Sequence, residues 1–173
     1  MPGCSTTQKI LRLTEAISSG LDRKWSTVAV FLDISKPCNT TWHMGLLYKL
    51  THMGLPGELI TVIDSYLAHR SFRVRMDGAL SAWKPMFAGV PQDSTLSPML
   101  YNLYTSDIAK SIRTELAVHA DDICIYDQQK NVGFAHLAVQ RHLNVIGRWA
   151  ADWRINISAQ KTKAVFFSKK TRL

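Results

Sequence analysis

The chain has 173 residues, of which 46% are hydrophobic and 20% are charged, and its net charge is +8 at pH 7. That length suits about one domain with a buried core, and the composition excludes a disordered protein. The basic excess favours a polyanionic partner such as nucleic acid, although a basic surface without such a partner gives the same charge.

Hydrophobic periodicity and turn signals divide the chain into helices and strands. Residues 27–32 are apolar and rich in β-formers, so we expect a strand that is buried on both faces and ends at Asp33. Pro37 then stops regular structure. The expected elements are a helix from Ser5 or Thr6 to about Gly20, that strand, helices at about 46–54 and 56–69, a hairpin over 71–87, a helix over about 94–112, strands at 116–119 and 123–126, a long helix with an apolar stripe over 143–153, and a strand at 164–167. This order favours an α+β fold with helices packed on one face of a mostly antiparallel sheet.

Three aspartates stand at the ends of the expected strands. Asp33 ends the first strand, and Asp121 and Asp122 form the turn before residues 123–126. Carboxylates in one small volume repel one another unless cations neutralise them, and hard oxygen ligands select Mg²⁺ or Mn²⁺. Two such ions about 4 Å apart can activate a hydroxyl and stabilise the leaving oxygen of a phosphoryl transfer. The structural alternatives are an ordinary polar turn and a strand-terminal cap.

Several short segments share an order and spacing that is typical of one family. They are residues 29–36, 42–43, 45–50, 72–75, 77–78, 88–92, 97–98, 101–104, 119–122, 153–157 and 161–163. These segments resemble the reverse-transcriptase domain of non-LTR retrotransposons, most closely the jockey-like mobile elements. The resemblance runs from about Ser5 to the C-terminus, with motif A in the first segment and motif D in the last two.

The resemblance implies a polymerase palm, with an antiparallel sheet of ferredoxin-like type and partial fingers, that acts as an RNA-directed DNA polymerase (a nucleotidyltransferase). Asp33 and Asp121 would be the main ligands of two Mg²⁺ (or Mn²⁺) ions, with Asp122 in a supporting role. The partners would be an RNA template, a DNA primer and deoxynucleoside triphosphates, with no membrane. The residues expected to contact the substrates are Ile34, Cys38, Gln92, and either Lys161 or Lys163 near the leaving pyrophosphate.

Several motif residues depart from the family pattern. Pro37, Cys38 and Asn39 stand where the family has Ala-Phe-Asp, and the small Cys38 should weaken discrimination against ribonucleotides. Asp93 replaces the glycine that follows the motif B glutamine, which adds a negative charge near the expected phosphates. Alternatively, Asp93 caps the helix expected from about residue 94. His119 replaces an aromatic residue of motif C, which is a milder change.

Relative to the family, the match begins inside the fingers and stops after motif D. We therefore expect a truncated copy, with a single palm domain and partial fingers over residues 1–173, finger or palm elements at about 1–30 and 55–88, no thumb and no endonuclease domain. Three functions stay open: an active polymerase, a catalytically inactive relic that keeps the palm fold, and a basic nucleic-acid-binding module with a steep salt dependence. The changed motif residues favour low or absent activity for this polypeptide alone.

Targeting signals are absent from the sequence. No apolar run approaches the length of a membrane span, and the residues after Met1 have no apolar signal-peptide core. The three cysteines form no CxxC pair, and an odd number argues against a disulfide framework. We expect an intracellular protein, either nuclear or cytoplasmic.

Overall fold

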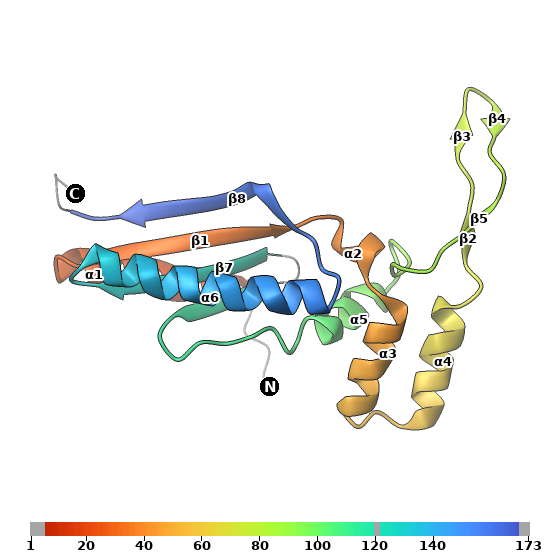
Figure 1. Cartoon of the computed structure of the whole chain (residues 1–173), viewed down its shortest axis with the longest axis horizontal. Coiled ribbons are helices and arrows are strands. Elements are labelled where there is room, and N and C mark those ends of the chain that lie inside the picture. The colour runs from red at the N-terminus through yellow and green to blue at the C-terminus, as the bar shows by residue number, and fades with distance from the viewer. Residues whose placement is uncertain (1–5, 120–121, 170–173) are drawn as a thin grey trace. The chain divides into compact units, whose positions relative to one another are not determined.

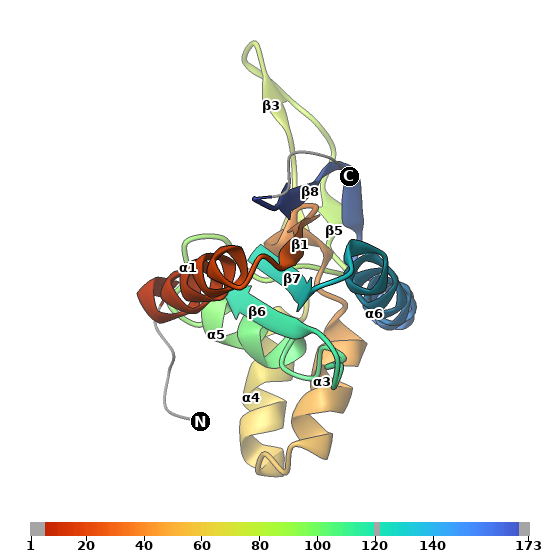
Figure 2. The ribbon, with the colours of Figure 1, turned by 90° about the vertical axis from the view of Figure 1, so that its left-hand side faces the viewer.

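The computed structural model describes residues 6–119 and 122–169, which form two compact units. The sheet unit takes its described residues from Met1–Ser35, Ile108–Ala151 and Ile157–Leu173, and the helical unit consists of Lys36–Asp107 and Asp152–Asn156. The elements are α1 (Thr6–Asp22), β1 (Ser26–Ile34), α2 (Pro37–Thr40), α3 (His43–His52), α4 (Gly57–Leu67), β2 (Ser71–Phe72), β3 (Arg75–Met76), β4 (Ala79–Leu80), β5 (Lys84–Pro85), α5 (Ser97–Tyr104), β6 (Glu115–His119), β7 (Asp122–Gln129), α6 (Val132–Asp152) and β8 (Ile157–Phe167). Figure 1 labels all of them except β6, which is labelled in Figure 2. None of the described helices is both long and apolar enough to cross a membrane.

The sheet unit is built on four antiparallel strands in the order β6-β7-β1-β8. β1 lies inside the sheet, where its β-branched and aromatic residues pair with β7 on one side and with β8 on the other. Of these strands, the first in the chain stands between the third and the fourth, and the second is at an edge, which is the order of ferredoxin-like sheets. The predicted α+β fold with an antiparallel sheet is confirmed.

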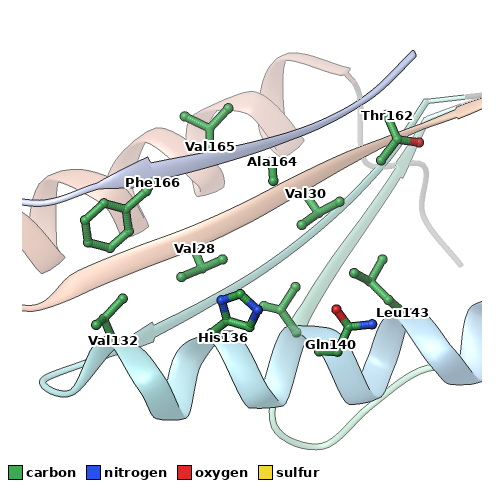
Figure 3. Close-up of a pocket in the computed structure, with 11 residues that line it drawn as sticks. Val28, Val30, Val132, His136, Gln140, Leu143, Thr162, Ala164, Val165 and Phe166 are labelled. Carbon is green, nitrogen blue, oxygen red and sulfur yellow. The ribbon is translucent and has the colours of Figure 1, made fainter. Parts of the chain in front are cut away.

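Helices cover both faces of this sheet, not one face as the sequence predicts. Ala29 of β1 packs with Leu13 and Ala16 of α1, whereas Val28 and Val30 point toward α6 across an apolar cavity of about 490 Å³ (Figure 3). Successive residues of a strand point to opposite faces, so α1 and α6 lie on opposite sides of the sheet (Figure 2). The correction follows from β1 itself, because a strand that is apolar on both faces needs a cover on each.

The helical unit packs α3, α4 and α5 around a small apolar core. Leu46 and Leu50 lie one turn apart on α3 and are fully buried, as are Leu67 of α4 and Leu100 of α5. Gly54, with φ of +78°, follows the end of α3, where a left-handed residue commonly terminates a helix. The predicted ends of both helices near residues 54 and 69 are therefore close to the observed ones.

Two elements of the helical unit differ from expectation. Pro37 opens the short helix α2 instead of stopping regular structure, because its fixed φ suits the first helical turn. The helix expected over about 94–112 is only α5. It begins late because Ser94 forms a local turn, in which the Leu96 amide donates to Ser94 Oγ, and such a bond competes with the helix. It ends early where the Thr105 hydroxyl donates to the Tyr101 carbonyl, a bond that competes with helix propagation.

A buried lysine holds the segment Asp152–Asn156 to the rest of the helical unit. Lys49 is 4% exposed, and its Nζ donates to the Tyr104 carbonyl at 2.6 Å and lies 2.5 Å from Asp107 Oδ1. The same ammonium stands 3.7 Å from the centre of the Trp153 ring, and the Tyr104 hydroxyl donates to the Trp153 carbonyl. Burial lowers the pKa of Lys49, and the hydrogen bond to Asp107 opposes that shift.

Candidate active site

Two of the predicted acidic residues lie opposite each other in the sheet unit. Asp33 of β1 is in register with Asp122 of β7, and β6 pairs with β7 as far as His119 and Asp122. Residues directly opposite in antiparallel strands have Cβ atoms about 4.5–5.5 Å apart and share a face. Asp121, the third predicted ligand, lies outside the described residues. Ile34, a predicted substrate contact, has its side chain in the core, with 4% exposed.

Asp33 has a carboxylate oxygen that suits a cation. Its Oδ2 is buried and receives no hydrogen bond from the described residues, and Asp122 is its direct strand partner. A buried anionic oxygen beside a second acid is unfavourable unless a positive charge compensates it. The Lys161 ammonium lies 3.6 Å from this oxygen on a largely exposed side chain, so solvent screens its charge. The pair therefore fits a hard divalent ion such as Mg²⁺ or Mn²⁺. No group of three possible ligands occurs among the described residues, so ligands from outside them are needed to complete such a site.

An irregularity in β8 brings one of the two predicted lysines to Asp33. β8 pairs Lys163 with Phe31 and Ser158 with Asp33 of β1, so residues 159–162 have no register partner. Two hydrogen bonds close this bulge: the Lys161 amide donates to Ser158 Oγ, and the Thr162 hydroxyl donates to the Ser158 carbonyl. Lys161 Nζ lies 3.6 Å from Asp33 Oδ2. The structure thus places Lys161, and not Lys163, beside the acidic pair.

The loop that carries motif B is held against α2 inside the helical unit. The Val90 amide donates to the Cys38 carbonyl at 2.6 Å. Gly89 has φ of +91°, and a Cβ there would stand 2.9 Å from the Asn39 carbonyl oxygen. Only glycine combines that backbone conformation with so close an approach. The sequence signal was present, because an isolated glycine between apolar residues often marks such an approach.

Gln92 has a partner that the motif pattern did not single out. Its Nε2 donates to Asn39 Oδ1 at 3.1 Å, so the residue that stands in place of the family's aspartate fixes the side chain predicted to contact substrate. Cys38, next to Asn39, is half-buried and forms no disulfide. All three residues belong to the helical unit. No sequence pattern predicts the contact between Gln92 and Asn39, because the two residues are 53 positions apart along the chain.

Residues 1–172 match the protein family described as "Reverse transcriptase (RNA-dependent DNA polymerase)". The chain belongs to the reverse transcriptase family. This reverse transcriptase domain is 33% identical to the RNA-directed DNA polymerase from mobile element jockey of Drosophila melanogaster, over 96% of the chain. It is also 33% identical to the probable RNA-directed DNA polymerase from transposon X-element of the same species, over 98% of the chain. The chain spans 19% of the length of each relative.

Solved structures agree on the fold of the reverse transcriptase domain. The apo telomerase from Candida tropicalis superimposes with a TM-score of 0.66 at 13% identity, over 98% of this chain and 37% of that one. A telomerase from Candida albicans, in complex with a fragment of telomeric RNA, gives a TM-score of 0.66 at 14% identity, over 98% and 31% of the two chains. The two mobile-element relatives confirm the resemblance to non-LTR reverse transcriptases, and the two solved structures confirm the α+β fold.

Replacing Asp93 by glycine is expected to stabilise the reverse transcriptase domain by about 0.5–1 kcal/mol, because a left-handed backbone strains any residue with a Cβ. Asp93 adopts φ of +59°, and it does not cap α5, whose N-cap is Leu96 without a side-chain bond. The alternative of a capping role for Asp93 is thus wrong. Urea unfolding of the variant and the parent chain measures the difference.

The matched control for this prediction is Asp64→Gly. Asp64 is an exposed aspartate inside α4, where glycine should cost about 1 kcal/mol. Equal destabilisation by both substitutions would mean that the backbone at residue 93 is not strained.

Proposed function

We propose that this reverse transcriptase domain is the palm with partial fingers, including finger or palm elements at about 1–30 and 55–88, of an RNA-directed DNA polymerase of a non-LTR element. Its reaction would add deoxynucleotides to a primer 3′-hydroxyl, directed by an RNA template. The observation that carries the proposal is the pairing of Asp33 with Asp122 across two central strands, with the Asp33 Oδ2 atom buried and lacking a hydrogen bond. Family membership supports nucleic-acid substrates and divalent metals.

Asp33, Asp121 and Asp122 would hold two Mg²⁺ or Mn²⁺ ions. Bound there, the ions would supply a more acidic hydroxyl for attack and positive charge for the leaving oxygen. The protein's part is to keep the carboxylates rigid, and the central position of β1 does this because both of its edges are paired. The Cβ alternation of the strands keeps both acids on one face.

Lys161 is the lysine that we assign to the leaving pyrophosphate. Its Nζ stands 3.6 Å from Asp33 Oδ2 while its side chain is 71% exposed, so it can turn from the carboxylate to an incoming triphosphate. An ammonium donates up to three hydrogen bonds, and these strengthen as negative charge develops on the leaving group. Lys163 pairs instead with Phe31, which precedes Asp33 on β1.

A palm fold that no longer polymerises is the second candidate. The observation that favours it is Asp93, which adds a carboxylate and a left-handed backbone directly after Gln92. Cys38 favours it too, because a thiol is too small to pack under the sugar of a nucleotide as an aromatic side chain would. In this case the chain would bind nucleic acid without extending a primer.

Primer extension on an RNA template decides between the two candidates. The chain, given Mg²⁺ or Mn²⁺, is compared with its Asp121→Asn, Asp122→Asn double variant. The proposed polymerase predicts that the chain extends the primer and the double variant does not, while both bind the primer–template equally at low salt. The inactive palm, which the changed motif residues favour, predicts binding without extension by either chain. A folded chain that binds but extends nothing, even after Cys38→Phe and Asp93→Gly, would support the inactive palm and overturn the proposed polymerase.

A further inference from the structure

The hairpin between α4 and the motif B loop projects from the helical unit as a two-stranded ribbon (Figure 1). β2 pairs with β5 near its base, and β3 pairs with β4 near its tip. Every residue from 71 to 85 is exposed, on both faces of the ribbon. Among the described residues, nothing covers it, although an isolated ribbon of this length is marginally stable in water.

The ribbon is nevertheless well organised along its length. At the tip, Asp77 and Gly78 both have positive φ, +49° and +84°, which is the turn that matches the twist of a hairpin. Halfway down, the Ser81 amide donates to the Val74 carbonyl, and the Val74 amide donates to Ser81 Oγ, both at 2.9 Å. The ribbon would therefore lose little conformational entropy on binding a ligand, because it is already ordered.

The base of the ribbon is tied to the motif B loop. The Arg70 guanidinium donates to the Gly89 carbonyl at 3.0 Å, and His43 Nε2 contacts the same oxygen at 2.7 Å. The Met86 amide donates to the Arg70 carbonyl at 2.8 Å. A ligand bound to the ribbon would therefore be bound by an element that is anchored to the same loop as Gln92.

The exposed side chains of the ribbon combine positive charge with aromatic area. Its cations are Arg73, Arg75 and Lys84, and its one acid is Asp77 at the tip. The Arg73 guanidinium lies 4.7 Å from the centre of the Trp83 ring, and Trp83 is 60% exposed. Guanidinium groups bind phosphates, and an exposed indole stacks on any base. A protein partner would need acidic side chains opposite all three cations, whereas a nucleic acid carries a negative charge on every phosphate.

We propose that this ribbon binds single-stranded nucleic acid, with phosphates on Arg73, Arg75 and Lys84 and a base stacked on Trp83. The interaction is independent of sequence, because every base has a face that stacks and every nucleotide has a phosphate. It deepens the proposed function, on which it rests for the identity of the strand as template. The binding itself needs no metal.

The test measures binding of labelled oligo(U) and oligo(dT), each about 15 nucleotides long, in the presence of EDTA. Fluorescence anisotropy reports the affinity at salt concentrations from about 50 to about 200 mM. We expect Trp83→Ala to weaken binding about tenfold, and Trp83→Phe to restore most of it. Arg73→Ala should weaken binding and reduce the slope of log affinity against log salt by about 0.7. Arg148→Ala, which removes an exposed arginine of α6, is the charge-matched control and should change binding less than twofold.

Two outcomes would overturn the inference. In one, the parent chain binds and the ribbon variants bind equally well, so the strand is held elsewhere and the proposed polymerase is unaffected. In the other, Trp83→Ala leaves binding unchanged but converts a dimer into a monomer in sedimentation, so the ribbon contacts a second copy. A third result separates the two proposals. If the parent chain binds in a way that depends on Trp83 but extends no primer, the proposed polymerase is wrong and the role of the ribbon stands.

Discussion

Asp33→Asn is expected to abolish the stabilisation that Mn²⁺ gives the folded chain and to lower primer extension about a thousandfold, or about 4 kcal/mol of transition-state stabilisation. The reason is that Asp33 Oδ2 is a buried carboxylate oxygen that receives no hydrogen bond from the described residues, and an amide brings no negative charge to bind a cation. Thermal unfolding with and without Mn²⁺ measures the first effect, since a ligand bound only by the folded state raises the melting temperature. A primer-extension assay measures the second.

The control is Asp64→Asn, which neutralises an exposed aspartate of α4. It should keep both the Mn²⁺ effect and the rate of extension. If Asp33→Asn still responded to Mn²⁺ as the parent chain does, the ion would be bound elsewhere and the acidic pair would not be the metal site.

Asp107→Ala is expected to destabilise the chain by about 3 kcal/mol, because it leaves the ammonium of Lys49 buried without its carboxylate. Lys49 is 4% exposed, and Asp107 Oδ1 is 2.5 Å from its Nζ. Chemical denaturation at pH 7 measures the loss. The Lys49→Met, Asp107→Ala double variant should be closer to the parent chain than the single variant, since replacing both partners removes the uncompensated charge.

The same lysine predicts a dependence of stability on pH. Burial lowers the pKa of Lys49 below its ordinary value of 10.5. At pH values between the folded pKa and 10.5, the unfolded chain therefore binds more protons than the folded chain. Stability therefore gains from this group as pH rises from its folded pKa to 10.5. The gain should be larger in Asp107→Ala, which loses the partner that opposes the shift, and absent in Lys49→Met. Equal profiles for all three chains would mean that Lys49 is charged at no cost.

The sequence was sufficient to bring Asp33 and Asp122 together, because strand ends and a short turn can be recognised from apolar runs. It was not sufficient to choose between Lys161 and Lys163. That choice depends on the unpaired residues 159–162 of β8, and a bulge leaves no periodic trace in the sequence. Asp121 lies outside the described residues, so its predicted role as a ligand stays a prediction.

The structure differs from the sequence-based prediction in two other places, and the sequence pattern does not reveal the physical cause of either. The late start of α5 depends on the turn at Ser94, whose hydroxyl accepts from the Leu96 amide. In the sequence, a serine before an apolar run equally predicts the N-cap of a helix. The placement of α1 and α6 on opposite faces was implied by the doubly apolar strand β1, but the order of elements alone favours one covered face.

The pairing of β1 also bears on how the chain folds during synthesis. Its partners on both sides lie far downstream: Ser26 pairs with Gln129, Asp33 with Asp122, and Thr27 with Phe167. β1 therefore leaves the ribosome with both edges bare, and it waits while the whole segment Lys36–Asp107 is translated. Contacts of such long range fold slowly, and an unpaired apolar strand is a site of aggregation. This strand therefore stays open to aggregation until β7 and β8 have been synthesised.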